Sequence, residues 1–461
     1  ITNNGSVTGN GFTWGGNFTN GATGSLQLTN GGIAGDFLNY GTFDVIGTVV
    51  LSGAVADQLG GQIRIPSGAV LQRTTGPFRW VNGTIGGDGA GTGNLSFTGG
   101  GSFQFAGTGD RVIDGLNFTF NNLTLPNGSL TLQSGSLTLN GNTALPSGVA
   151  LNLNGGTLAN NGTLDIGGTF DLSGGAFTGT GSLTMSGGSL TLPASNSVSW
   201  TNSGALTNTG TLNLAAATIT NAIDNQGTIN TGNGLIFSQT FVNNGTLNLG
   251  AGTTTFSGGL VQNAGTTHLG GTSVVGNVTI NAGLLNGSGS ISGNVDVTGG
   301  TLGVGNSPGT LNIGGNLTLG SGSTTQIELG GTGGGQYDLI NVAGNAALDG
   351  ALVVTYWGGF SGGGSFPVMS WGSSSGAFAS TNFPAAGFTL AYGASGMTLD
   401  LAAVLPVSPT ALANALAEVP VNPLLVMLAM NDPIEDPMMI ETDEEGGIRL
   451  RSLSGGAQPC R

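Results

Sequence analysis

The sequence predicts an all-β fold, a parallel β-helix or β-solenoid in which short strands stack coil upon coil. Gly supplies 92 of the 461 residues and only 6% are charged, yet 38% are hydrophobic, so the chain has apolar side chains to bury. Helices are disfavoured, because Gly, Thr, Asn and Ser are poor helix formers. One N-x-G phrase recurs along the chain, and a short alternation of apolar and polar residues follows it.

Residues 1–150 are predicted to form less regular solenoid coils. They contain the same Asn–Gly phrases and short apolar–polar alternations as the later repeats, as in "NYGTFDVIGTVVLSG" from Asn39 and "NGSLTLQSGSLTLNGN" from Asn127. This part also holds a basic–aromatic cluster, Arg64, Arg73, Arg79 and Arg111 with Phe78, Trp80, Phe103 and Phe105. The cluster could be a ligand-contacting loop or a cap on the first regular coils. The need of solenoid ends to cover open edges favours the cap.

Residues 151–333 are predicted to form the regular repeats. The glycines that mark the phrase are 17 to 20 residues apart, and a period near 20 is typical of a solenoid. An Asn stands two positions before each mark, at Asn208, Asn225, Asn243, Asn263 and Asn281. Because identical residues of successive coils stack about 4.8 Å apart, these side chains are predicted to form one hydrogen-bonded ladder of amides. The same Asn–Gly spacing occurs at Asn39 and Asn160.

The residues after each mark predict the strands and the core. In "GTLNL", Leu247 and Leu249 would face the interior, and Thr246 and Asn248 the solvent. The predicted inward core residues are Leu212, Ile229, Leu247, Leu269 and Leu285. A sandwich of hairpins is the structural alternative, but it would not require a column that repeats about every 18 residues.

The segment after Gly300 carries more specific phrases. "GNSPGTLNIGGNLTL" from Gly305 is followed by "YDLINVAGNAALDGALVV" from Tyr337. This combination resembles the distal passenger region of bacterial autotransporters and of exported adhesins of the filamentous-haemagglutinin type. The resemblance implies a right-handed β-helix, exported across an outer membrane by an exporter on another chain or an absent segment, and serving in adhesion or surface coating. Residues 334–402 would then be the distal passenger-like region that caps the rod.

Residues 403–461 form a Pro-rich, acidic tail. "SPTALANALAE" from Ser408 predicts a short helix, with Ser408 as N-cap and Pro409 at the first position. The tail is either a flexible processed segment or a segment that docks on the rod end or on a neighbouring molecule. Cys460 is the only cysteine, so any disulfide it makes would be intermolecular.

The charges exclude some functions. The net charge is −15, Lys is absent, and no Arg stands between Arg111 and Arg449, which argues against binding of nucleic acid. The acidic residues of the rod beyond residue 112 are scattered and most stand at outward positions, so the sequence shows no pair suited to acid–base catalysis. His268 aligns with Asn248 on the outside and is predicted to be an isolated surface residue. We therefore expect no enzyme activity, no metal and no cofactor.

Two functions remain from the sequence, both extracellular or on a bacterial cell surface. One is a non-enzymatic, adhesin-type rod that presents a binding surface to a host, surface or glycan ligand. The other is a structural subunit that self-associates end to end into an extracellular filament. A polysaccharide-active β-helix enzyme is the least favoured alternative, because no site for it is found.

Overall fold

A computed structural model describes residues 1–88, 93–192, 198–305, 308–401, 438–442 and 448–452. The chain forms two compact units, Ile1–Ala403 and Val404–Arg461. Every regular element in the described residues is a β-strand, and none of them contains a helix long and apolar enough to cross a membrane. The predicted short helix from Ser408 and the predicted role of Cys460 lie outside the described residues.

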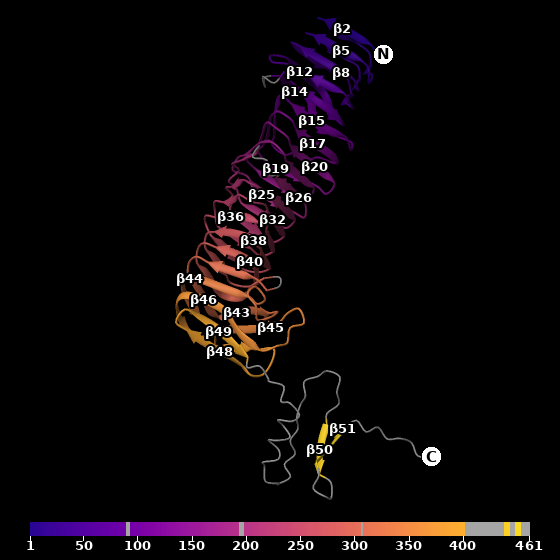
Figure 1. The fold of residues 1–461 in the computed structure, drawn as a ribbon. Coiled ribbons are helices and arrows are strands. Elements are labelled where there is room, and N and C mark those ends of the chain that lie inside the picture. The colour runs from indigo at the N-terminus through magenta and orange to yellow at the C-terminus, as the bar shows by residue number, and fades with distance from the viewer. Residues whose placement is uncertain (89–92, 193–197, 306–307, 402–437, 443–447, 453–461) are drawn as a thin grey trace, which may run out of the picture. The chain divides into compact units, whose positions relative to one another are not determined.

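The first unit is a rod of stacked coils, as Figure 1 shows, and each coil has three sides. Face 1 comprises β1 (Thr2–Asn3), β4 (Phe18–Asn20), β7 (Phe37–Asn39), β10 (Ala56–Gln58), the second halves of β12 (Val70–Trp80) and β14 (Asn94–Phe105), β19 (Asn142–Leu145), β22 (Thr163–Ile166), β25 (Ser182–Met185), β28 (Leu206–Asn208), β31 (Ile223–Asn225), β34 (Phe241–Asn243), β37 (Leu260–Gln262), β39 (Val278–Ile280), the first halves of β41 (Val295–Gly303) and β43 (Leu317–Leu329), and the second half of β44 (Leu339–Leu348).

Face 2 follows face 1 around each coil. It comprises β2 (Ser6–Asn10), β5 (Ser25–Thr29), β8 (Thr42–Ile46), β11 (Gln62–Arg64), β13 (Gly83–Gly86), β15 (Asp110–Asp114), β17 (Gly128–Leu132), β20 (Val149–Leu153), β23 (Thr169–Leu172), β26 (Ser189–Leu192), β29 (Thr211–Leu214), β32 (Thr228–Thr231), β35 (Thr246–Leu249), the first halves of β38 (Thr266–Val275) and β40 (Leu284–Ile291), the ends of β41 and β43, β45 (Ala351–Tyr356) and β47 (Ser380–Asn382).

Face 3 completes the coil. It comprises β3 (Thr13–Trp14), β6 (Gly32–Ile33), β9 (Thr48–Leu51), the first halves of β12 and β14, β16 (Leu116–Phe120), β18 (Gly135–Leu139), β21 (Thr157–Asn160), β24 (Gly175–Thr178), β27 (Val198–Trp200), β30 (Thr218–Ile219), β33 (Leu235–Phe237), β36 (Gly252–Phe256), the second halves of β38 and β40, β42 (Thr310–Ile313), the first half of β44, and β46 (Gly364–Gly376), whose last residues continue onto face 1.

Strands of neighbouring coils pair in parallel and in register, which confirms the predicted β-solenoid. On face 2, for example, Ile229 lies opposite Leu247, and Asn230 lies opposite Asn248. Successive side chains of a strand point to opposite sides, so the apolar residue of each pair enters one continuous core and the polar one faces solvent. Leu, Ile, Val and Phe fill that core from Phe18 to Leu399.

The strand pairing of the described wall is interrupted at two places: on face 3 between β27 and β30, and on faces 1 and 3 after β14. β14 pairs with β12, and β16 pairs with β18, but no pairing joins β14 to the coil that follows it on faces 1 and 3. Face 2 continues without a break through β13, β15 and β17. Aromatic rings fill the interruption after β14: the ring centroids of Phe103 and Phe105 are 4.9 Å apart, and Phe103 also contacts Phe118 and Phe120.

An antiparallel hairpin follows the last coils. β48 (Phe388–Gly393) pairs with β49 (Gly396–Leu401), and β49 pairs in turn with β46. The change from parallel to antiparallel pairing ends the repeat, because a hairpin strand cannot pass to another coil. In the second unit, β50 (Met438–Thr442) and β51 (Ile448–Ser452) form an antiparallel pair.

Candidate functional site

The inner amide ladder is the best-defined polar feature of the rod. Asn208, Asn225 and Asn243 are each fully buried and lie opposite one another in consecutive coils. Asn208 Nδ2 donates to Asn225 Oδ1 at 2.7 Å, and Asn225 Nδ2 donates to Asn243 Oδ1 at 2.8 Å. Each amide also donates to a main-chain carbonyl at the corner, as Asn225 does to Thr246 O at 3.0 Å. The ladder therefore satisfies polar groups that the corner would otherwise bury unpaired.

The prediction that Asn263 and Asn281 continue this ladder is wrong. Asn243 lies opposite Gln262, and Gln262 lies opposite Ile280. Asn263 and Asn281 are exposed, and Asn281 Nδ2 donates to Asn263 Oδ1 at 2.8 Å in a separate outer pair.

A longer corner causes this displacement. Gly245 stands two positions after the buried Asn243, whereas Gly265 stands three positions after the buried Gln262. Gly265 accommodates the extra residue with a φ of 63°, and a Cβ there would lie 2.0 Å from Gly245 O. Only glycine tolerates both demands. The Asn therefore keeps its distance from the glycine but moves out of the core.

A second inner ladder lies in the first coils, and the sequence interpretation missed most of it. Asn3 donates to Asn20 at 2.8 Å, Asn20 to Asn39 at 2.8 Å, and Asn39 to Gln58 at 2.7 Å. Asn4 and Gly5 follow Asn3, and Gly21 directly follows Asn20, so a search for Asn or Gln before a corner glycine, with the spacing left free, would have found it. Asn160, in contrast, is buried on β21 and belongs to the corner between faces 3 and 1.

All five predicted inward residues are buried. Leu212, Ile229 and Leu247 lie opposite one another on face 2. Leu269 lies opposite Leu249 in the neighbouring column, while Leu285 continues the first column beyond Thr267. Thr267 is buried between Leu247 and Leu285 because its hydroxyl accepts a bond of 3.1 Å from Asn243 Nδ2. The ladder thus ends on a hydroxyl that takes the place of a core leucine.

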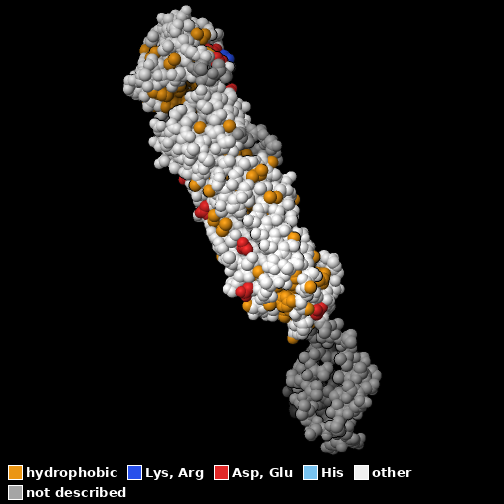
Figure 2. All heavy atoms as spheres, turned by 90° about the vertical axis from the view of Figure 1, so that its left-hand side faces the viewer, with side chains coloured by type: hydrophobic (Ala, Val, Ile, Leu, Met, Phe, Trp, Pro, Cys, Tyr) orange, Lys and Arg blue, Asp and Glu red, His pale blue; other side chains and the backbone are white. Residues whose placement is uncertain are grey.

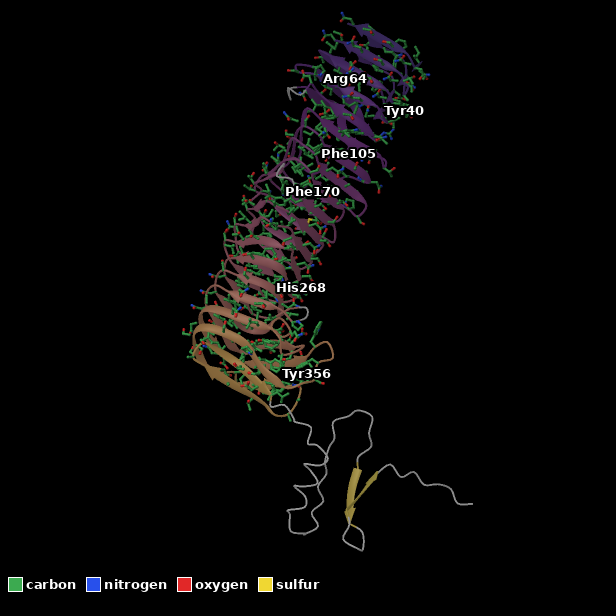
Figure 3. All side chains as sticks on the ribbon, in the orientation of Figure 1. Tyr40, Arg64, Phe105, Phe170, His268 and Tyr356 are labelled. Carbon is green, nitrogen blue, oxygen red and sulfur yellow. The ribbon has the colours of Figure 1, made fainter. Side chains whose placement is uncertain are left out.

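The predicted basic–aromatic cluster separates into surface and interior residues. Arg64 is half exposed and pairs with Asp44 at 2.5 Å, and Arg79 pairs with Asp57. Arg73 and Arg111 are fully buried, and burial lowers the pKa of both guanidinium groups. Figure 3 shows Arg64 and Phe105 in the upper part of the rod, within the stacked coils. The cluster therefore does not cap an end of the rod.

Arg111 binds main-chain carbonyls beside the interrupted wall. Its guanidinium donates to Trp80 O at 2.9 Å, Gly109 O at 3.0 Å and Asn127 O at 3.0 Å, and Arg111 Cζ lies 5.8 Å from the centroid of the Phe105 ring. Five donors in a fixed fork suit a place where several carbonyls converge. The side chain acts there as a structural plug.

The acidic residues are placed as expected, with one exception. His268 lies opposite Asn248 on the outside of face 2, as its alignment predicts. No group of three His, Cys, Asp or Glu side chains that could hold a metal occurs among the described residues. Asp338, however, is fully buried and does not follow the outward placement predicted for most of the acidic residues. Burial raises its pKa to about 7, and the backbone hydrogen bonds that it accepts oppose this shift only in part.

The sides of the rod are otherwise polar and nearly neutral. Figure 2 shows one face on which uncharged polar side chains and backbone predominate, with scattered acidic groups. The exposed large aromatic residues of the described part are Phe12, Tyr40, Trp357 and Tyr392.

Comparison with known protein families finds no family model that matches the chain. Comparison with curated proteins likewise finds no match.

Proposed function

We propose that the chain is the shaft of an exported bacterial surface protein of the adhesin type, a stiff rod that holds binding surfaces away from the cell. The continuous pairing of face 2 from β2 to β47 is the observation that carries this proposal. Each coil adds roughly 4.8 Å to the axis, and a wall that is hydrogen bonded along its length resists bending. Rigidity and reach are the properties that a presenting shaft requires.

The composition of the surface supports an extracellular role. Lys is absent and no Arg occurs between Arg111 and Arg449, so the rod carries few groups that would bind anionic polymers. The resemblance of the segment from Gly305 to autotransporter passengers points to the same location. Catalysis is not part of the proposal, because no acidic residue lies opposite another in the strand pairs of the described residues.

A bead-attachment assay tests the adhesin proposal. The full chain would be coupled to beads through Cys460, its only cysteine. Attachment would then be measured to surfaces coated with glycans, with extracellular-matrix protein or with epithelial cells. We expect beads carrying the folded chain to attach to at least one surface more than tenfold better than beads carrying the heat-denatured chain. Equal attachment on every surface would refute the adhesin role.

A filament subunit is the second candidate. β1, β2 and β3 each pair with a single neighbouring strand, so the first coil presents unpaired edges. At the other end of the unit, the antiparallel hairpin of β48 and β49 extends the sheet beyond β46, while β47 on face 2 pairs only with β45. This asymmetry disfavours simple end-to-end stacking. Electron microscopy of the concentrated full chain decides between the candidates, since separate rods and long fibres are easily distinguished.

A further inference from the structure

Asp338 joins three segments near the end of the rod. Its carboxylate accepts a bond of 2.8 Å from the backbone N–H of Gly309, before β42, and one of 2.8 Å from Glu328 N, in β43. Its own N–H donates to Glu328 O at 2.9 Å. The side chain is 0% exposed. One carboxyl group therefore holds together two successive coils and the loop that leads to β44.

The loop of residues 330–337 depends on this junction. Gly330 N donates to Gln336 O at 2.7 Å, and a bridge joins Leu329 to Tyr337. The loop also supports Trp357, which is 45% exposed: a Cβ on Gly330 would lie 3.0 Å from Trp357 Cε3. The indole ring thus rests directly on the backbone of the loop. Release of Asp338 would free both the loop and the underside of this ring.

No positive charge compensates the carboxylate. The sequence has no Lys, and no Arg between Arg111 and Arg449, so every element packed against Asp338 lacks a basic side chain. The titratable groups on those elements are the Glu328 carboxyl and the phenols of Tyr337 and Tyr356. Glu328 Oε2 is buried without a hydrogen-bond partner, and burial raises the pKa of Glu328 as well. Ionisation of Asp338 therefore places a second negative charge in a poorly solvated site.

We propose that Asp338 is a pH-sensitive latch, closed when its carboxyl group is neutral and loosened when it is charged. In the closed state its pKa is about 7, whereas the ordinary value of 3.8 applies once the loop opens and the group reaches water. The closed state binds the proton more tightly, so closure is fully favoured below about pH 3.8 and this advantage is lost as the pH rises to 7. Above that pH the group is charged in both states and the opening equilibrium no longer changes.

Hydrogen exchange of the full chain between pH 5 and pH 9 tests the latch. Protection factors, corrected for the pH dependence of intrinsic exchange, would be compared for the amides of Gly309, Glu328 and Gly330. We expect them to fall by up to roughly tenfold per pH unit up to about pH 7 and to level off above it. The amide of Thr246, which donates to Gly227 O at 2.7 Å in a distant coil, serves as the control and should not change.

Two variants separate the latch from a merely structural contact. Asp338→Asn should remove the pH dependence of the loop, and Glu328→Gln should move the transition to lower pH by removing the neighbouring charge. The second variant keeps the test decisive if the first does not fold. Constant protection of the wild-type loop would overturn the proposal, and so would an unchanged transition in both variants.

Discussion

Replacing Asn225 by Ala tests whether the inner ladder stabilises the rod. The substitution removes three hydrogen bonds, to Asn208, to Asn243 and to Thr246 O, with lengths of 2.7, 2.8 and 3.0 Å. Each such bond contributes a net 0.5–1.5 kcal/mol, and Asn208 Nδ2 and Asn243 Oδ1 keep one other partner each, so we expect a loss of about 3 kcal/mol in the free energy of unfolding.

Asn263→Ala is the matched control. It removes the same side chain from the same phrase, but its bond of 2.8 Å to Asn281 is exposed, and water replaces it. We expect a change within about 0.5 kcal/mol. Both variants would be unfolded in denaturant and followed by circular dichroism, and exchange of the Thr246 amide would report the local effect, because a repeat protein need not unfold in one step. Equal losses in the two variants would refute the division of the asparagines into an inner and an outer set.

Two further substitutions test the core and the plug. Leu247→Asp buries an unpaired charge at a fully buried position and should cost several kcal/mol of unfolding free energy, whereas Asn248→Asp, one position along and facing outward, should be nearly neutral in thermal melts. Arg111→Leu removes the guanidinium that donates to the partly buried carbonyls of Ala106, Gly107 and Asn127 and should cost about 2 kcal/mol or more, whereas Arg64→Leu loses only a surface ion pair worth roughly 1 kcal/mol or less. Comparable melting shifts within either pair would contradict the burial assigned here.

The sequence was sufficient for the fold class because the periodicity is redundant. Every coil repeats an apolar residue, a polar residue and a corner glycine, and a single misplaced residue does not hide a pattern that recurs so often. Leu212, Ile229 and Leu247 were assigned to the core on that ground, and all three are buried. Because successive side chains of a strand point to opposite faces, the alternation of apolar and polar residues is enough to assign each side chain to the core or to the solvent.

The ladder was harder to predict, because the corners vary in length while the strands do not. The glycine is the conspicuous register mark of the sequence, yet the position of the buried amide is fixed by the strand before it. Thr279 carries the signal of the shift. The residue four positions before each marking glycine is apolar in the preceding repeats (Leu206, Ile223, Phe241 and Val261), but it is Thr279 before Gly283, where the buried residue is the neighbouring Val278. Alignment on the apolar positions would have placed Gln262 beneath Asn243.

Asp338 could not be assigned from the pattern at all. It follows a Gly-rich loop with no counterpart in other coils, so no column predicts its direction. Its burial depends on Gly309, 29 residues earlier, because the Asp338 carboxylate accepts a hydrogen bond from the Gly309 N–H. A contact that occurs only once in a repetitive chain leaves no periodic pattern in the sequence. The buried carboxyl group of Asp338 is such a contact.

In the first coils the inner column keeps one role while its residues change, although later coils place Met185 and Ile280, which have no side-chain N–H, in the same column. Asn39 donates to Gly41 O at 3.1 Å, Gln58 to Gly60 O at 2.5 Å, and Trp80 Nε1 to Gly83 O at 3.1 Å. Trp80 lies opposite Gln58 in the next coil, yet an indole cannot accept a bond from an amide, so stacking of amide on amide is not the common requirement. The common requirement of these first coils is a buried N–H donor for the corner carbonyl. A substitution such as Asn39→Gln, which keeps the donor, should therefore be tolerated better than Asn39→Asp, which removes the donor and adds a charge, although the aspartate is closer in shape.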